Sequence, residues 1–359
     1  MNIVFRVDSS LSIGIGHLMR CLTLAQELRV RATSIVFISR KHEGNLNHVV
    51  TEAGYKLYEL SSDAVFKCDD EVSLYAKWLG SSWEEDASQT NRIIARLKID
   101  LLVVDHYALD YKWENIVKAN CSKLMVIDDL ANRKHDCDVL LDQTYGRVVT
   151  DYYQLISDKC ILLLGSSFAL LRSEFSYWRE LSLRYRESPK IEHLIITLGG
   201  IDKEDVTGQI IVALKDCHLP IGFELTIVMG ANAPHIDNVR QLAKNMHCKT
   251  QVLVGITNIA EHMAKNDLAI GAAGSSSWER CCLGLPTLMV VTAENQKNNA
   301  KILEQNKAVI LVAEPIKLSL IKIFSELTGK VVKNLSTNSA KLVDGIGCER
   351  VIDRLKEII

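Results

Sequence analysis

The chain has 359 residues, which at about 150 residues a domain predicts two domains. Its composition, 48% hydrophobic and 24% charged, is typical of a globular protein. Because 42 Lys and Arg residues nearly balance 44 Asp and Glu residues, we expect no general electrostatic attraction to nucleic acid or to an anionic membrane surface. Any anion that the chain binds must therefore be held by a local site.

Targeting, membrane and disulfide signals are all weak. The longest apolar runs, such as residues 160–164, are far shorter than the ~20 residues that a bilayer-spanning helix needs. A strand-like run at residues 3–5 opens the chain, so we expect no signal peptide, no membrane partner and a cytoplasmic location. The ten cysteines are scattered and form no Cys-x-x-Cys pair, so we expect free, mostly buried thiols.

In the first half of the chain, short apolar runs alternate with helical periodicity. The predicted strands are residues 2–7, 34–38, 101–104, 124–127 and 139–141. The later strands end in acids, at Asp105, Asp128-Asp129 and Asp142. Continuous apolar strands separated by helices indicate a parallel sheet covered on both faces, and such sheets bind ligands beyond the carboxyl ends of their strands.

A second alternation of strands and helices follows. Its predicted strands are residues 194–198, 224–229, 251–254, 268–271, 288–291 and 309–311. We therefore predict an α/β protein of two tandem, doubly wound, Rossmann-like domains that face an interdomain cleft. The N-terminal domain is placed at residues 1–165, a linker helix at 166–190, and the C-terminal domain with a final amphipathic helix at 191–359.

The turn after the first strand carries the first candidate site. Gly14 and Gly16 let the backbone approach a ligand, but the third glycine and the ribose-binding acid of a dinucleotide site are missing, which excludes NAD. His17 begins the next helix, where the N-terminus favours a neutral imidazole that can accept a proton. The ring either acts as a base or only packs at the turn, and Asp8 either orients the ring or caps the turn.

Asp105-His106-Tyr107 ends another strand of the same domain. The segment either supplies hydrogen-bonding groups to the same site or is an ordinary turn in which Asp105 caps the next helix. No His-x-x-x-His pair and no clustered set of carboxylates in the sequence suggests a metal site, so we expect no metal.

The second half carries the stronger signal. The small-residue loop at 272–277 joins a predicted strand to a helix, and such a loop cradles phosphate. Glu279 is placed to accept hydrogen bonds from a ribose diol, while Asn295 and Gln296 follow the next strand. The alternative is a plain turn with Glu279 complementing the helix dipole, and the glycines at 199 and 200 are equally open between phosphate binding and chain turning. The expected substrate-binding residues are Gly14, Gly16, Gly199, Gly200, Gly274, Ser275, Ser276, Glu279 and Gln296.

These motifs resemble those of a known family. Residues 6–22 are similar to the opening motif of the UDP-sugar hydrolases of pseudaminic acid biosynthesis, the PseG family, which runs approximately Arg-x-Asp-Ser-Ser, then Ile-Gly-x-Gly-His-x-Met-Arg-Cys-Leu. The second half also resembles the UDP-binding half of MurG-like GT-B glycosyltransferases. The likeness to the hydrolases continues through residues 105–107, 141–143, 165–175, 199–202, 273–286, 295–296 and 344–351.

The resemblance implies a GT-B fold with UDP in the C-terminal domain. It implies hydrolysis of UDP-2,4-diacetamido-2,4,6-trideoxy-β-L-altropyranose to UDP and the free sugar, without metal or cofactor. His17 matches the catalytic histidine of the family, Tyr107 and Asn295 match residues that line the sugar site, and Glu279 matches the ribose-binding glutamate. The loop departs from the family at 272–275, where many relatives carry an extra glycine.

Two other functions stay open at this point. One is a GT-B glycosyltransferase that moves the sugar to an acceptor, and the other is a catalytically silent protein that binds nucleotide sugars. His17 speaks against the silent protein but does not distinguish the two enzymes. With His17 as the base for water on the face opposite UDP, hydrolysis is expected to invert the anomeric configuration.

Overall fold

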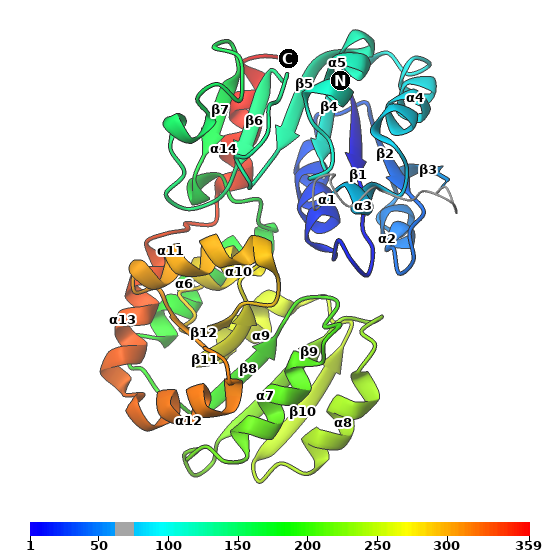
Figure 1. Ribbon diagram of the computed structural model, residues 1–359. Coiled ribbons are helices and arrows are strands. Elements are labelled where there is room, and N and C mark those ends of the chain that lie inside the picture. Colours follow the sequence, from blue (N-terminus) through cyan, green and yellow to red (C-terminus); the bar gives the residue numbers. More distant parts are fainter. Residues whose placement is uncertain (62–74) are drawn as a thin grey trace. The chain divides into compact units, whose positions relative to one another are not determined.

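The computed structural model describes residues 1–61 and 75–359. The chain divides into two compact units, one formed by residues 1–170 together with 347–359, and the other by residues 171–346 (Figure 1). Each unit contains one sheet whose strands all pair in parallel, with helices on its faces. The predicted fold of two Rossmann-like α/β halves is therefore confirmed. Within the described residues, no helix is long and apolar enough to cross a membrane.

The sheet of the first unit has seven strands in the order β3-β2-β1-β4-β5-β6-β7. Its strands are β1 (Asn2–Val7), β2 (Ser34–Arg40), β3 (Lys56–Leu60), β4 (Ile99–Asp105), β5 (Cys121–Ile127), β6 (Val139–Asp142) and β7 (Ile161–Leu164). Strand β1 pairs with β2 on one side and with β4 on the other. The chain order therefore reverses beside β1, and the carboxyl ends of β1 and β4 meet at the position where α/β sheets commonly bind ligands.

The helices of the first unit follow the strands. They are α1 (Gly16–Leu28), α2 (Asn47–Glu52), α3 (Ala76–Leu79), α4 (Trp83–Ile94), α5 (Tyr111–Val117) and α14 (Gly347–Lys356). Local chemistry sets two of the starts: the Ser82 hydroxyl accepts a hydrogen bond from the amide of Glu85 at 3.2 Å, and the Asp110 carboxylate accepts one from the amide of Lys112 at 2.9 Å. Each cap satisfies an amide that the helix itself leaves without an acceptor.

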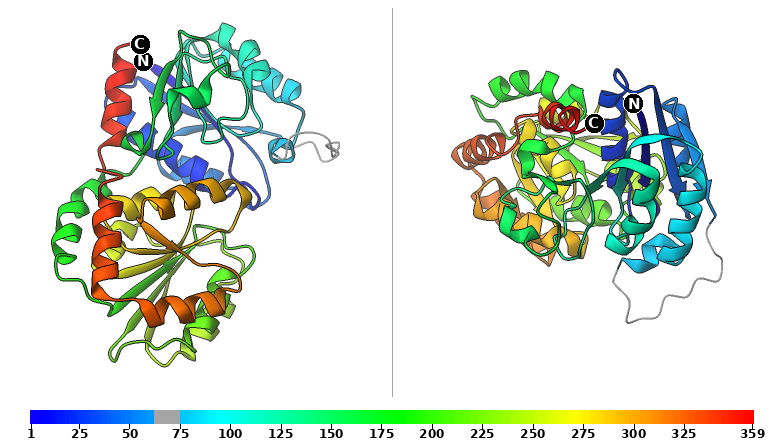
Figure 2. Two further views of the ribbon diagram at one scale, coloured as in Figure 1. Left: turned by 60° about the vertical axis from the view of Figure 1, so that its left-hand side comes forward. Right: turned by 90° about the horizontal axis from the view of Figure 1, so that it is seen from above.

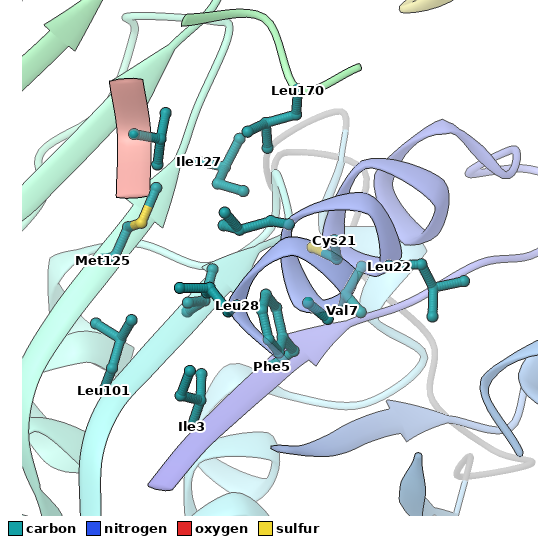
Figure 3. Close-up of a cluster of buried hydrophobic side chains, with 14 of the residues drawn as sticks. Ile3, Phe5, Val7, Cys21, Leu22, Leu28, Leu101, Met125, Ile127 and Leu170 are labelled. Carbon is teal, nitrogen blue, oxygen red and sulfur yellow. The ribbon is translucent and has the colours of Figure 1, made fainter. Parts of the chain in front are cut away.

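Side-chain alternation along the strands builds one core on each face of this sheet. Ile3, Phe5 and Val7 of β1 pack with α1 on one face, where Figure 3 shows them beside Cys21 and Leu28. Residues of the opposite parity, beginning with Val4, pack with α4 and α5 on the other face. Because both faces of the sheet are covered, residues of both parities are apolar. The strands are therefore continuously apolar in the sequence.

The final helix corrects the predicted domain boundary. Helix α14 belongs to the first unit, although the sequence analysis assigned it to the C-terminal domain (Figure 2). Cys348, Val351, Ile352 and Leu355 are buried in the same core as β1 and α1. The amphipathic pattern of this helix indicates that one face is buried, but it does not indicate which of two sheets provides the partner.

The second unit has a six-stranded sheet in the order β10-β9-β8-β11-β12-β13. Its strands are β8 (His193–Thr197), β9 (Glu224–Met229), β10 (Lys249–Val254), β11 (Leu268–Ala272), β12 (Thr287–Val290) and β13 (Val309–Leu311). Its helices are α6 (Ser173–Tyr185), α7 (Val206–Leu214), α8 (Ile236–Lys244), α9 (Ile259–Lys265), α10 (Ser276–Cys282), α11 (Lys297–Gln305), α12 (Ile316–Glu326) and α13 (Gly329–Ala340). The order reverses beside β8, which pairs with both β9 and β11.

Helix α6 is an integral part of the second unit, whereas the sequence analysis treated residues 166–190 as a separate linker. The Arg179 guanidinium donates to the carbonyls of Ala340 and Val343 at 2.8 and 2.9 Å. The Ser182 hydroxyl donates to the carbonyl of Leu283 at 2.7 Å. These bonds satisfy carbonyls at the C-terminal ends of α10 and α13, so α6 is fixed by backbone groups of its own unit.

We predict that Leu355→Ala lowers the free energy of unfolding by about 2–5 kcal/mol, because it leaves a cavity in the core shared by α14 and α1. Leu355 is 2% exposed. Hydrogen exchange followed by mass spectrometry should show faster exchange in the amides of α1 and β1. The control is Leu318→Ala, since Leu318 is 64% exposed. Faster exchange confined to the second unit would contradict the placement of α14.

Candidate active site

The loop between β1 and α1 is a tight turn that holds itself in place. The amide of Gly14 donates to the carbonyl of Ser10 at 2.9 Å, and the Ser10 hydroxyl accepts from the amides of Ser12 and Ile13 at 3.1 and 2.9 Å. Gly14 has φ of +79°, a backbone conformation that favours glycine. Gly16 is the first residue of α1. The turn therefore delivers the start of α1, and with it His17, to the carboxyl end of the sheet.

His17 is bound by the carboxylate that ends β4. Its Nδ1 lies 2.6 Å from Oδ1 of Asp105. Arg20, one turn later on α1, donates to both oxygens of Asp105, from Nε at 2.6 Å and from Nη2 at 2.7 Å. The other Arg20 nitrogen, Nη1, lies 2.5 Å from Oδ2 of Asp129. Two carboxylates at the carboxyl edge of the sheet thus hold one arginine and, through Asp105, one histidine.

The electrostatics of this group keep Asp105 ionised. Burial favours the neutral carboxyl, but the Arg20 guanidinium and His17 outweigh burial and hold the pKa of Asp105 well below its usual range. An ionised Asp105 accepts hydrogen bonds only, so Nδ1 of His17 carries the proton in their 2.6 Å contact. The remaining nitrogen, Nε2, is then the basic one in the neutral ring.

Asp8 does not orient His17, so the first of the two roles that the sequence left open for it is wrong. Both Asp8 oxygens bind Arg6, at 2.5 and 3.0 Å, and Oδ1 also accepts from the amide of Arg40 at 2.6 Å. Arg6 is fully buried and also contacts Asp86, with Nη2 to Oδ2 at 2.6 Å. Asp8 therefore neutralises a buried guanidinium, and the His17 ring is oriented by Asp105 instead.

An aromatic cluster lies against the His17 ring. The ring centroids of His17 and Tyr107 are 4.5 Å apart in an edge-to-face arrangement. Trp78 of α3 stacks on Tyr107 at 5.8 Å and meets His17 edge-on at 6.5 Å. The Tyr107 hydroxyl donates to Oδ2 of Asp129 at 3.0 Å, which ties the cluster to the Arg20 group. Tyr107 was a predicted site residue, whereas Trp78 was not, because a four-residue helix carries too little periodicity to be noticed.

The other acids at this edge are bound by groups of their own loops. Asp128 pairs with Arg133 at 2.6 Å, and the Tyr152 hydroxyl donates to Oδ2 of Asp142 at 2.9 Å. Burial, reinforced by the negative charge of Asp129, raises the pKa of Asp142 to about 6. Of the four acids that end β4, β5 and β6, only Asp105 and Asp129 contact the His17 group.

In the second unit, the predicted phosphate loop follows β11 and leads into α10. The amide of Ser277 donates to the carbonyl of Gly274 at 2.9 Å, and that of Trp278 donates to Ser275 at 3.1 Å, so Gly274–Ser276 precede the first internal bonds of the helix. Glu279, in the first turn, is partly buried, and this burial raises the pKa of its carboxyl. Its Oε1 lies 3.9 Å from Nη2 of Arg172, a cation that the sequence analysis did not place here.

Two amide side chains approach this loop. A Cβ placed on Gly274 would lie 3.7 Å from Nε2 of Gln296, while Oε1 of Gln296 accepts from the amide of Thr292 at 3.0 Å. Asn299 of α11 donates to the carbonyl of Ala273 at 2.8 Å, and its Oδ1 is buried without a hydrogen-bond partner. Asn295 is exposed at the surface. Gln296 therefore lies beside the loop as expected, and Asn299 joins it although the sequence analysis did not include it.

Gly199 and Gly200 follow β8 and turn the chain there. Gly199 has φ of +97°, and a Cβ on Gly230 would lie 2.0 Å from the carbonyl oxygen of Gly200. Asp202, next in the loop, accepts from the amides of Val206 and Thr207 at 3.0 and 2.7 Å and so caps α7. The positive φ accounts for the glycine at 199, and the close approach to Gly200 accounts for the glycine at 230, while phosphate binding by Gly199 and Gly200 stays a prediction.

Neither disulfides nor metal clusters are found in the part of the chain that the structure describes. Every cysteine described there is a free thiol, as expected. Among residues 1–61 and 75–359, no three His, Cys, Asp or Glu side chains are grouped so that they could hold a metal ion.

We predict that Asp105→Asn lowers the free energy of unfolding at pH 7 by about 3–5 kcal/mol, because it leaves the buried Arg20 without its main counter-charge. The folded pKa of Asp105 is depressed, so its stabilisation is complete above the usual pKa of about 4 and is lost as the pH falls toward the folded value. Urea unfolding at pH 7, 5 and 3 measures the difference in unfolding free energy between the original chain and the variant. This difference should be the same at pH 7 and pH 5 and smaller at pH 3. Asp237→Asn, at a side chain that is 99% exposed, is the control. A difference that grows toward pH 3 would contradict the assignment.

The chain is similar in sequence to known proteins. Residues 195–342 match the glycosyltransferase family 28 C-terminal domain. The chain is 27% identical, over 84% of its length and 95% of the relative, to the UDP-2,4-diacetamido-2,4,6-trideoxy-β-L-altropyranose hydrolase of Campylobacter jejuni. It is 24% identical, over 74% of its length and 79% of the relative, to the spore coat polysaccharide biosynthesis protein SpsG of Bacillus subtilis.

Solved structures show the same fold. MurG of Acinetobacter baumannii superposes with a TM-score of 0.70 at 14% identity, covering 99% of both chains. The Staphylococcus aureus MnaA structure with UDP has a TM-score of 0.62 at 12% identity, covering 99% of this chain and 96% of that one. The chain therefore has the GT-B fold of MurG-like proteins, and the resemblance to UDP-sugar hydrolases of pseudaminic acid biosynthesis that its motifs indicated is confirmed.

Proposed function

We propose that the protein hydrolyses UDP-2,4-diacetamido-2,4,6-trideoxy-β-L-altropyranose to UDP and the free sugar, in the biosynthesis of pseudaminic acid. The observation that carries the proposal is the His17–Asp105 contact of 2.6 Å at the carboxyl edge of the first sheet. The hydrolase of Campylobacter jejuni, which is similar over nearly its whole length, supports the choice of substrate.

His17 is the general base in this proposal. Hydrolysis of a glycosyl phosphate already has a good leaving group in UDP, so the main task is to deprotonate one water molecule. The ionised Asp105 holds the proton on Nδ1, which leaves the Nε2 lone pair to accept the proton of water. When the ring becomes positively charged, Asp105 stabilises it, as a carboxylate does in other histidine-based sites.

Tyr107 and Trp78 supply the surroundings of the base. Their stacked rings, at 5.8 Å, form an apolar wall beside His17. Burial raises the pKa of Tyr107 far above its usual range, so the phenol stays neutral and acts as a hydrogen-bond donor. We propose that this wall packs against the sugar, and that the Tyr107 hydroxyl, held by Asp129 at 3.0 Å, fixes the position of the ring.

The second unit holds the nucleotide in this proposal. The free amides at Gly274–Ser276 bind the diphosphate, and Glu279 accepts hydrogen bonds from the ribose diol. Gln296, which lies beside Gly274, and Asn295 provide further polar groups to the sugar and the phosphates. Because water attacks on the face opposite UDP, the sugar first appears with inverted anomeric configuration.

A glycosyltransferase is the second candidate, because residues 195–342 match the glycosyltransferase family 28 C-terminal domain. The two enzymes differ in what they need to release UDP. A hydrolase releases UDP from the nucleotide sugar alone, whereas a transferase requires an acceptor. Incubation with a panel of UDP-sugars, with and without candidate acceptors and with EDTA present, separates them and also detects a protein that only binds.

We predict that His17→Asn lowers kcat by about 10²–10⁴, the usual contribution of a general base, while UDP binding is unchanged. The measurement is release of UDP from the UDP-sugar, together with calorimetric titration of UDP. His48→Asn, at an exposed position of α2, is the control. Turnover of the His17 variant within a few-fold of the original chain would reduce this residue to a structural role.

We predict that Glu279→Ala weakens UDP binding by about 1–3 kcal/mol, the range for lost hydrogen bonds to a charged group. Binding of uridine should weaken to the same extent, because the lost contact is to the ribose. Glu304→Ala, at an exposed position of α11, is the control. An unchanged UDP affinity in a folded Glu279 variant would place the ribose elsewhere.

A further inference from the structure

Arg280 is a buried cation directly behind the loop that we propose binds diphosphate. The residue is 1% exposed and lies on α10 next to Glu279. Its Nη2 donates to the carbonyl of Ala272 at 2.5 Å and lies 3.3 Å from the Ser277 hydroxyl, and its Nη1 donates to the Ser276 hydroxyl at 3.0 Å. The guanidinium therefore contacts both ends of the loop through neutral oxygens.

The backbone of β11 is shaped around this guanidinium. A Cβ placed on Gly271 would lie 2.6 Å from both Cζ and Nη1 of Arg280. Any other residue at this position would push the guanidinium away from the loop. The buried Nε of Arg280 has no hydrogen-bond partner. Strand β11 thus has glycine, without a side chain, at a core position that the Arg280 guanidinium occupies. The second unit leaves one nitrogen of this guanidinium without a hydrogen-bond acceptor.

The charge of Arg280 lacks a partner of opposite sign. Within residues 1–61 and 75–359, no carboxylate oxygen lies within 4.0 Å of its guanidinium nitrogens. Burial lowers the pKa of this guanidinium to about 10. Buried charges are ordinarily paired, because removing an ion from water is costly. In the first unit the rule is obeyed, since the buried Arg6 lies against Asp8 and Asp86.

We propose that Arg280 is a positioning residue whose buried charge is compensated by a diphosphate on the loop that it braces. It holds the loop through Ala272, Ser276 and Ser277, and it supplies the positive charge that the loop amides alone do not provide. This inference rests on the proposed UDP site. Its consequence is that Arg280 selects for the diphosphate part of the ligand and contributes little to binding of the nucleoside part.

The test compares Arg280→Lys with Arg280→Met, two variants of similar length that differ in charge. Calorimetric titration with UDP, UMP and uridine gives the affinity of each ligand. In Arg280→Met we expect UDP affinity to fall about tenfold or more, UMP affinity to fall less, and uridine affinity to stay the same, because Coulomb attraction acts on phosphate charge alone. In Arg280→Lys we expect UDP affinity to stay within a few-fold of the original value.

Arg186→Met is the matched control. Arg186 is a second buried guanidinium of the same unit, its pKa is also lowered by burial to about 10, and it donates to the carbonyls of Met263 and Asn266 at 3.0 and 2.6 Å. Its loss should lower thermal stability without changing the ratio of UDP to uridine affinity. If Arg280→Met fails to fold, Gly271→Ala tests the same point, because the added methyl group displaces the guanidinium while keeping its charge in the chain.

The outcomes separate this inference from the proposed function. Equal loss of UDP and uridine affinity in Arg280→Met, or an unchanged UDP affinity in that variant, would overturn the role of Arg280 while leaving the UDP site in place. Failure of the Lys variant to keep UDP affinity above that of the Met variant would also overturn it. Absence of UDP binding to the original chain would instead remove the proposed function on which the inference rests.

Discussion

The candidate active site depends on the hydrogen bonds and ion pairs of the Asp105 carboxylate. Asp105 ends β4, the strand that pairs with β1, and it binds His17 and Arg20 of the helix that follows β1. The sheet register therefore decides that His17 and Arg20 have an anion between them. Arg20 in turn binds Asp129 at the end of β5, so three consecutive segments of the sheet edge are joined through one guanidinium. A histidine held in this way has one fixed tautomer and little freedom to rotate.

The two units handle buried charge in different ways. In the first, each buried arginine of the network below the site meets carboxylates: Arg6 contacts Asp8 and Asp86, and Arg40 contacts Asp86 at 2.7 Å. In the second, Arg186 and Arg280 rest on carbonyls and hydroxyls. Balanced charges hold the segments below His17, the general base that we propose, in fixed positions. A guanidinium without a counter-ion suits a site whose ligand brings its own negative charge.

Sequence patterns predicted the parts of this structure that depend on local order. Apolar runs gave the strands, acids at their ends marked the carboxyl edge of the first sheet, and the small residues before Glu279 marked the start of α10. The pairing of His17 with Asp105 rather than Asp8 depends on β4 lying beside β1, which no local pattern reports. Asp8 was the nearer acid in sequence, yet Arg6, two residues before it, occupies both of its oxygens.

Trp78 and Arg280 could not be predicted from the sequence for the same reason, because their roles depend on contacts that no local pattern reports. Trp78 reaches Tyr107 across the fold, and Arg280 becomes significant only because Gly271 leaves room for it. An arginine in a short helix reads as a surface residue when its burial is unknown. The placement of α14 depends on which of the two units buries its apolar face. An amphipathic pattern identifies that face but does not identify the unit that covers it.

The return of α14 to the first unit has a consequence for the order of assembly during synthesis. The second unit is a single continuous stretch, residues 171–346, so all of its strands and helices have been made before α14 is. The first unit begins the chain but needs residues 347–359 to close the core around α1. Domains made early usually fold early. Here the second unit can finish folding first, while the apolar face of α1 stays uncovered until α14 has been made.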